Sequence, residues 1–113
     1  MYRVTKRDGS ITEFHIAKIG NAITRAFEAV GRQQHPSVIE LLALRVTAEF
    51  EPKIRNELIS VEDIQDCVER VLSEAGYADV AKAYILYRKQ REKLRNVGMN
   101  KVEGQWDYGK LET

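Results

Sequence analysis

The Asp8-Gly9 pair near the start of the chain constrains the fold most, because it separates two short β-prone runs, residues 2–6 and 11–14. Asp-Gly is a preferred pair in two-residue hairpin turns, whose central residues both adopt positive φ. The pattern therefore predicts an N-terminal β-hairpin. Two strands alone are unstable in water, so this hairpin must lie on a larger body.

A two-residue turn also predicts the register of the hairpin. It places Lys6 opposite Ile11 and Val4 opposite Glu13. Because side chains alternate across a strand, these four would share one face with Tyr2. That face is the more apolar of the two, yet it carries a lysine. A lysine on a packed face needs an anion beneath it.

Four later stretches carry apolar residues at three- and four-residue spacing, which predicts amphipathic helices. They cover approximately residues 16–30, 37–50, 60–75 and 78–95. Gly31 and Gly76 follow the first and third stretches, as helix-terminating glycines do. Pro52 indicates that the second helix ends near Phe50.

Two serines are expected to begin helices. Ser37 and Glu40 have the spacing of a capping box, and Ser60 precedes two acidic residues of a first turn. The predicted inner face of the second helix contains Val38, Leu41, Leu42, Val46 and Phe50.

These elements predict a mostly α, α+β fold: a four-helix bundle capped at one end by the N-terminal hairpin as a lid. Leu58-Ile59 could add a short third strand beside the hairpin. We expect one domain over residues 2–95 and a linker or flexible tail over residues 96–113, where helical periodicity is lost. Trp106 in this tail either docks loosely or contacts a further domain or subunit.

Composition excludes several classes of protein. Of the 113 residues, 43% are hydrophobic and 31% are charged, which is ordinary for one soluble domain. A net charge of +1 provides no field that would draw the chain onto nucleic acid or a membrane. No apolar run approaches a membrane span, and the first residues lack a signal-peptide core, so we expect a cytoplasmic location.

The reactive side chains are few. Cys67 is the one cysteine, which excludes an internal disulfide and a multi-cysteine zinc site. With two histidines and one cysteine, no nucleophilic triad or dyad is credible, so we expect no catalytic residues and no metal site. Helical spacing assigns Cys67, Tyr84 and Tyr87 to the core, although the two tyrosines could instead form a stacking platform. His15 is assigned to the surface, although it could cap the first helix or touch a ligand.

Several cations could meet an anionic ligand. Lys6 and Arg7 lie on the hairpin, Lys18 lies early in the first helix, and Arg88 and Arg91 share a face of the fourth. The alternatives are a solvated loop for the first two and a basic helix C-terminus for residues 88–95. The chain has no Gly-rich Walker loop, so side chains would have to bind any phosphates.

An ordered set of motifs over about residues 2–95 resembles the ATP-cone, the nucleotide-binding module at the N-terminus of many ribonucleotide reductases. The motifs are Lys6-Arg7-Asp8-Gly9, Phe14, Lys18-Ile19, the run 61–66, and the run 81–85 with Arg88. The run after Tyr87 resembles the anaerobic, glycyl-radical class. The cone also occurs in the repressor of reductase genes, which carries a zinc ribbon that has no counterpart here.

The resemblance implies a nucleotide site between the hairpin and the inner ends of the helices. By motif, Lys6 and Arg7 match the basic pair, Lys18 and Ile19 match the first-helix pair, and Ile64 and Gln65 line the base pocket. Some relatives carry histidine in place of Gln65. A basic residue at Arg88 or Arg91 is also implied. Val4 would bound the base slot. The predicted site is therefore Val4, Lys6, Arg7, Lys18, Ile19, Ile64, Gln65, Arg88 and Arg91.

The function implied is regulatory and not enzymatic. ATP or dATP, with Mg²⁺, would bind as an allosteric ligand and control the overall activity of a ribonucleotide reductase through its oligomeric state. The partners implied are the reductase's catalytic domain or subunits and a second copy of the chain. The alternative is a free-standing cone that acts as a nucleotide-responsive DNA-binding or protein-interaction regulator.

Overall fold

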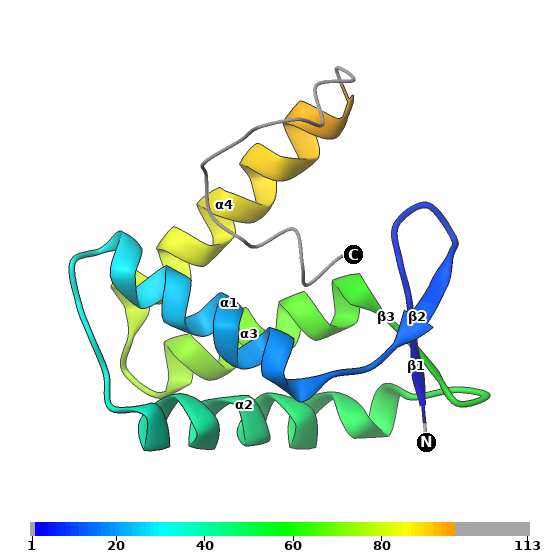
Figure 1. The fold of residues 1–113 in the computed structure, drawn as a ribbon, viewed down its shortest axis with the longest axis horizontal. Coiled ribbons are helices and arrows are strands. Elements are labelled where there is room, and N and C mark those ends of the chain that lie inside the picture. Colours follow the sequence, from blue (N-terminus) through cyan, green and yellow to red (C-terminus); the bar gives the residue numbers. More distant parts are fainter. Residues whose placement is uncertain (1, 97–113) are drawn as a thin grey trace.

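The structure is a computed structural model that describes residues 2–96 (Figure 1). The predicted α+β fold, with four helices and a small sheet, is confirmed. The predicted linker or tail beyond residue 96, with Trp106, lies outside the described residues. The elements in chain order are β1 Arg3–Thr5, β2 Ile11–Glu13, α1 Ile16–Ala29, α2 Pro36–Phe50, the 3₁₀ helix η1 Glu51–Lys53, β3 Leu58–Ser60, α3 Val61–Glu74 and α4 Ala78–Asn96.

The sheet has three strands in the order β2-β1-β3, so the proposed third strand is confirmed. β3 runs parallel to β1 and pairs Val4 with Ile59, although the two residues are far apart in sequence. Asn56 and Glu57, both at positive φ, turn the chain into β3, and the Glu57 carbonyl accepts a hydrogen bond from the Arg3 N–H at 2.9 Å. The central strand therefore carries Val4 into the core.

The predicted hairpin register is wrong by one residue. Val4 pairs with Thr12, and the Lys6 N–H donates to the Ser10 carbonyl at 2.8 Å. The loop thus has three residues, ending in Gly9 at φ +89°. The Asp8 carboxylate accepts hydrogen bonds from the Ser10 hydroxyl and N–H, which lower the pKa of Asp8. A one-residue shift moves each β2 side chain to the opposite face, which explains why Ile11 is 52% exposed.

The sheet lies at the end of the bundle where α1 and α3 begin and α2 ends (Figure 1). In that view α2 runs along the bottom, α1 and α3 cross the middle, and α4 rises from the far end back toward the hairpin. A single core of buried apolar side chains joins all four helices to β1 and β3. No helix among residues 2–96 is long and apolar enough to cross a bilayer.

Helix α2 departs from the prediction in two places. It begins at Pro36 and not after Ser37, because the His35 Nδ1 accepts the Ser37 N–H at 3.1 Å and proline is well suited to the first helical position. Leu41, predicted on the inner face, is 59% exposed, whereas the neighbouring Ala43 is buried. The buried stripe is therefore rotated around the helix toward smaller residues.

The other predicted helix boundaries are confirmed. The Ser60 hydroxyl accepts the Asp63 N–H at 3.1 Å and so caps α3. Helix α1 ends before Gly31, at φ +74°, where the Arg32 N–H reaches back to the Phe27 carbonyl at 3.0 Å. This is the Schellman arrangement expected where a glycine ends a helix.

Arg32 links two helices at the end of the bundle far from the sheet. Arg32 Nη1 donates to both carboxylate oxygens of Asp79, at 2.8 and 2.9 Å, and its guanidinium lies over the rings of Phe27 and Tyr77. The hydrogen bond from Arg32 lowers the pKa of Asp79. This contact ties the end of α1 to the start of α4.

Candidate functional site

Arg7, in the hairpin loop, is joined to the first turns of α3. Its Nη2 donates to Gln65 Oε1 at 2.7 Å, and its Nη1 donates to Glu62 Oε2 at 3.2 Å. Gln65 is 2% exposed and is the one buried polar side chain recorded among the described residues. The structure thus brings together two predicted site residues that are 58 positions apart.

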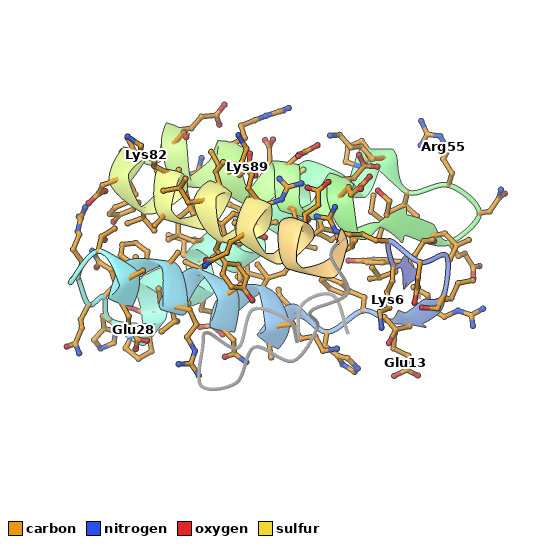
Figure 2. The ribbon with its side chains drawn as sticks, turned by 90° about the horizontal axis from the view of Figure 1, so that it is seen from above. Lys6, Glu13, Glu28, Arg55, Lys82 and Lys89 are labelled. Carbon is orange, nitrogen blue, oxygen red and sulfur yellow. The ribbon has the colours of Figure 1, made fainter. Side chains whose placement is uncertain are left out.

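Two lysines lie at the same end of the molecule. Lys6 directly follows β1 and is half-buried, and Figure 2 shows it at the hairpin end, opposite the end that carries Lys82 and Glu28. Lys18 is half-buried in the first turn of α1, which begins beside the sheet. Three predicted cations, Lys6, Arg7 and Lys18, therefore belong to elements that meet at one end of the bundle.

The apolar members of the predicted site form part of the core. Val4, Ile19 and Ile64, from β1, α1 and α3, are all buried. They come from the three elements that meet at the hairpin end. These side chains therefore belong to the part of the core at the hairpin end, where Ile64 directly precedes Gln65 on α3.

Arg88 projects from α4 onto α3. Its Nη1 donates to Asp66 Oδ1 at 3.1 Å and also to Glu69 Oε2. Burial alone would lower the pKa of Arg88, but the hydrogen bonds to Glu69 and Asp66 outweigh it and raise the pKa. Both carboxylates tie the later turns of α4 to α3. The side chain of Arg91 lies outside what the structure describes.

Three acidic residues of α3 were not among the predicted site residues. Glu62, Asp66 and Glu69, here called the acidic strip, are spaced at i, i+4 and i+7 and so share a face of the helix. The strip runs from Arg7 on the hairpin to Arg88 on α4. Its helical spacing is visible in the sequence, but its partners come from elements that only the fold brings near.

Three of the other residues considered in the sequence are buried, and one is exposed. Cys67, Tyr84 and Tyr87 are buried in the core, as predicted, and burial raises the pKa of the Cys67 thiol. His15 occupies the N-cap position of α1, but its side chain makes no capping hydrogen bond. The side chain is exposed, with its Nε2 3.6 Å from Glu13 Oε1. Within residues 2–96, no group of three or more histidine, cysteine or acidic side chains is placed to hold a metal ion.

A sequence model of the ATP cone domain family matches residues 2–93. The chain belongs to the ATP cone family. This finding confirms the resemblance drawn from the hairpin motif, the Lys18-Ile19 pair and the α3 run. The matched segment contains every element from β1 to α3 and ends within α4.

Relatives of this ATP cone occur in different kinds of reductase. It is 42% identical over 93 residues to the vitamin B12-dependent ribonucleoside-diphosphate reductase of Mycobacterium tuberculosis (strain CDC 1551 / Oshkosh), covering 82% of the chain and 13% of that protein. It is 39% identical over 98 residues to the ribonucleoside-diphosphate reductase subunit alpha of Chlamydia pneumoniae. That match covers 81% of the chain and 9% of the relative.

A third relative is an anaerobic ribonucleoside-triphosphate reductase from Haemophilus influenzae. The cone is 37% identical to it over 94 residues, covering 83% of the chain and 13% of that protein. The chain thus spans about a tenth of the length of these relatives. Because the three relatives are of different kinds, they do not single out the anaerobic class that the sequence after Tyr87 suggested.

Proposed function

We propose that this ATP cone is an adenine-nucleotide-binding regulatory domain of a ribonucleotide reductase and carries no catalytic residues of its own. The observation that supports this most directly is the Arg7–Gln65 hydrogen bond of 2.7 Å, which joins the basic hairpin to the α3 position implied to line the base pocket. Family membership supports the choice of ligand.

The site would bind a nucleotide through side chains. Lys6, Arg7 and Lys18 would receive the phosphates, because arginine and lysine form charge-assisted hydrogen bonds to phosphate oxygens. Gln65 offers an amide to the base or sugar. Arg88 and Arg91 would add charge from α4. Mg²⁺ would be held mainly by the phosphates and water, as it usually is in nucleotide sites.

Calorimetric titration of the 113-residue chain with ATP and dATP, each with and without Mg²⁺, tests this function. We expect saturable binding of both nucleotides. Absence of binding would favour the alternative regulators. Duplex DNA affinity that falls steeply with salt would then point to nucleic acid, and salt-insensitive capture of a protein partner would point to an interaction module.

We predict that ATP binds more tightly than GTP. In this proposal the buried Val4, Ile19 and Ile64 would bound an apolar slot for the base, and Gln65 would provide one amide beside it. One amide can satisfy the edge of adenine but leaves the guanine carbonyl poorly matched, and unmatched buried polar groups are costly. Competition titrations should show at least a tenfold difference in dissociation constant, on the order of 1.4 kcal/mol. Equal constants for ATP and GTP would contradict the predicted slot.

The output of binding, in this proposal, is a change of oligomeric state. The outer faces of α1 and α2 are candidate surfaces, since they border a groove of about 700 Å³ whose lining includes Ile16, Gly20, Ile39 and Leu44. Leu44 is among the exposed large apolar residues of α2. Exposed apolar residues gathered beside a groove are typical of interaction sites. A second copy of the chain is the proposed occupant.

Sedimentation velocity of the chain alone, with ATP and with dATP tests the oligomeric proposal. We expect the sedimentation coefficient to change on addition of nucleotide. Leu44→Ala should reduce that change while leaving nucleotide affinity intact, because Leu44 lies on the groove and not at the hairpin end. A monomer under all three conditions would place any switching in the parent reductase.

A further inference from the structure

The hydrogen bonds of Arg7 differ in kind. Gln65, which accepts from Nη2, is a neutral and buried amide, whereas Glu62, which accepts from Nη1, is an acidic side chain with 59% exposure. The Arg7 side chain itself is only 15% exposed. Glu62 is therefore the partner on the solvent side of an otherwise enclosed guanidinium.

We propose that Glu62 is an internal competitor for the nucleotide's phosphates at Arg7, and so sets the affinity of the site. This inference rests on the proposed function, since it assumes that a phosphate binds Arg7. A phosphate oxygen arriving from solvent meets the guanidinium edge that the Glu62 carboxylate already occupies. Both groups are anionic acceptors on the same edge of the guanidinium, so they repel each other and compete for its N–H donors.

The geometry makes Glu62 easier to displace from Arg7 than Gln65. An exposed carboxylate regains water when it releases its partner, and surface ion pairs contribute little to stability. Gln65 carries no charge that would repel a phosphate, and its burial favours retention of a hydrogen bond. The nucleotide would thus replace Glu62 and leave the Arg7–Gln65 contact in place.

Arg88, at the other end of the acidic strip, is bound more firmly to carboxylates than Arg7 is. It is held by two carboxylates, Asp66 and Glu69, and the latter is only 23% exposed. A phosphate at Arg88 would be repelled by both carboxylates. The competition is therefore concentrated at Glu62, at the hairpin end of the strip. Its effect should be confined to ligands that carry phosphates, since adenosine has no group to compete for Arg7.

Glu62→Gln tests the proposal, with Asp63→Asn as the matched control. Both substitutions remove one negative charge from the first turn of α3, and Asp63 contributes its backbone N–H, not its side chain, to the Ser60 cap. Only Glu62→Gln removes the carboxylate that pairs with Arg7. We expect Glu62→Gln to tighten ATP binding about three- to tenfold and Asp63→Asn to change it by less than about twofold.

The outcomes are distinguishable by calorimetry on the 113-residue chain. Adenosine affinity should be the same in both variants and in the unaltered protein. If Glu62→Gln binds ATP no more tightly than Asp63→Asn, or more weakly than the unaltered chain, Glu62 is not a competitor, even though the proposed function stands. If the unaltered chain binds no ATP, the proposed function fails and the competitor role fails with it.

Discussion

Replacing Phe50 by alanine is expected to destabilise the domain by about 3–5 kcal/mol. Phe50 is fully buried at the end of α2, and its ring contacts Tyr2 and Phe14 edge-on, with centroids 5.9 and 5.5 Å apart. The substitution leaves a cavity between the sheet and the bundle. The free energy of unfolding of a small domain is only about 5–15 kcal/mol, so the substitution would remove a large part of it.

Urea unfolding and thermal melting would measure this loss, with a fall in Tm of about 12–40 °C. Leu41→Ala is the matched control, because it truncates a large apolar side chain of the same helix at a position that is 59% exposed. It should change the free energy of unfolding by no more than about 0.5 kcal/mol. Equal losses in the two variants would contradict the rotated inner face of α2.

Lys6→Ala is expected to weaken ATP binding by about 1.5–3 kcal/mol, or roughly 10- to 150-fold, because it removes a hydrogen bond to a charged phosphate. Lys6 directly follows β1 and lies two residues after the buried Val4, so the alternation of an extended chain puts both on one side. The corrected pairing with β2 therefore leaves the expectation unchanged.

Lys82→Ala provides the control for the lysine. It removes the same charge from an exposed position at the opposite end of the molecule (Figure 2). Calorimetric titration should show ATP affinity within about twofold of the unaltered chain, because exposed charges beyond a Debye length of about 10 Å are screened. A loss below about 0.5 kcal/mol for Lys6→Ala would return Lys6 to the class of ordinary loop lysines.

Local signals predicted much of the fold. The 3.6-residue spacing of apolar side chains located all four helices, and Gly31, Ser60 and Gly76 marked their ends because each acts on backbone groups within a few residues. The start of α2 was misplaced since two local signals competed there. His35 with Pro36 at the first helical position was favoured over the Ser37 capping box.

The candidate site likewise contains residues that the motifs selected and residues that only tertiary contacts revealed. Sequence motifs selected Arg7 and Gln65, and the fold places them in contact. The motifs did not select the acidic strip, because Glu62, Asp66 and Glu69 also suit an ordinary solvated helix face. Whether a carboxylate on such a face pairs with an arginine depends on which element packs against it, and that element is distant in sequence.

The sequence by itself determined the hairpin, the four helices, their order and the family of this chain, because periodicity, capping and motif spacing are properties of neighbouring residues. Only the tertiary structure decided the three-residue hairpin loop and the parallel pairing of β1 with β3. It also decided the pairing of Arg7 and Arg88 with carboxylates of α3. The β1–β3 pairing and the ion pairs depend on contacts between segments distant in sequence, which come together only when the chain folds. The hairpin loop is local, and its length follows from the pairing of Lys6 with Ser10.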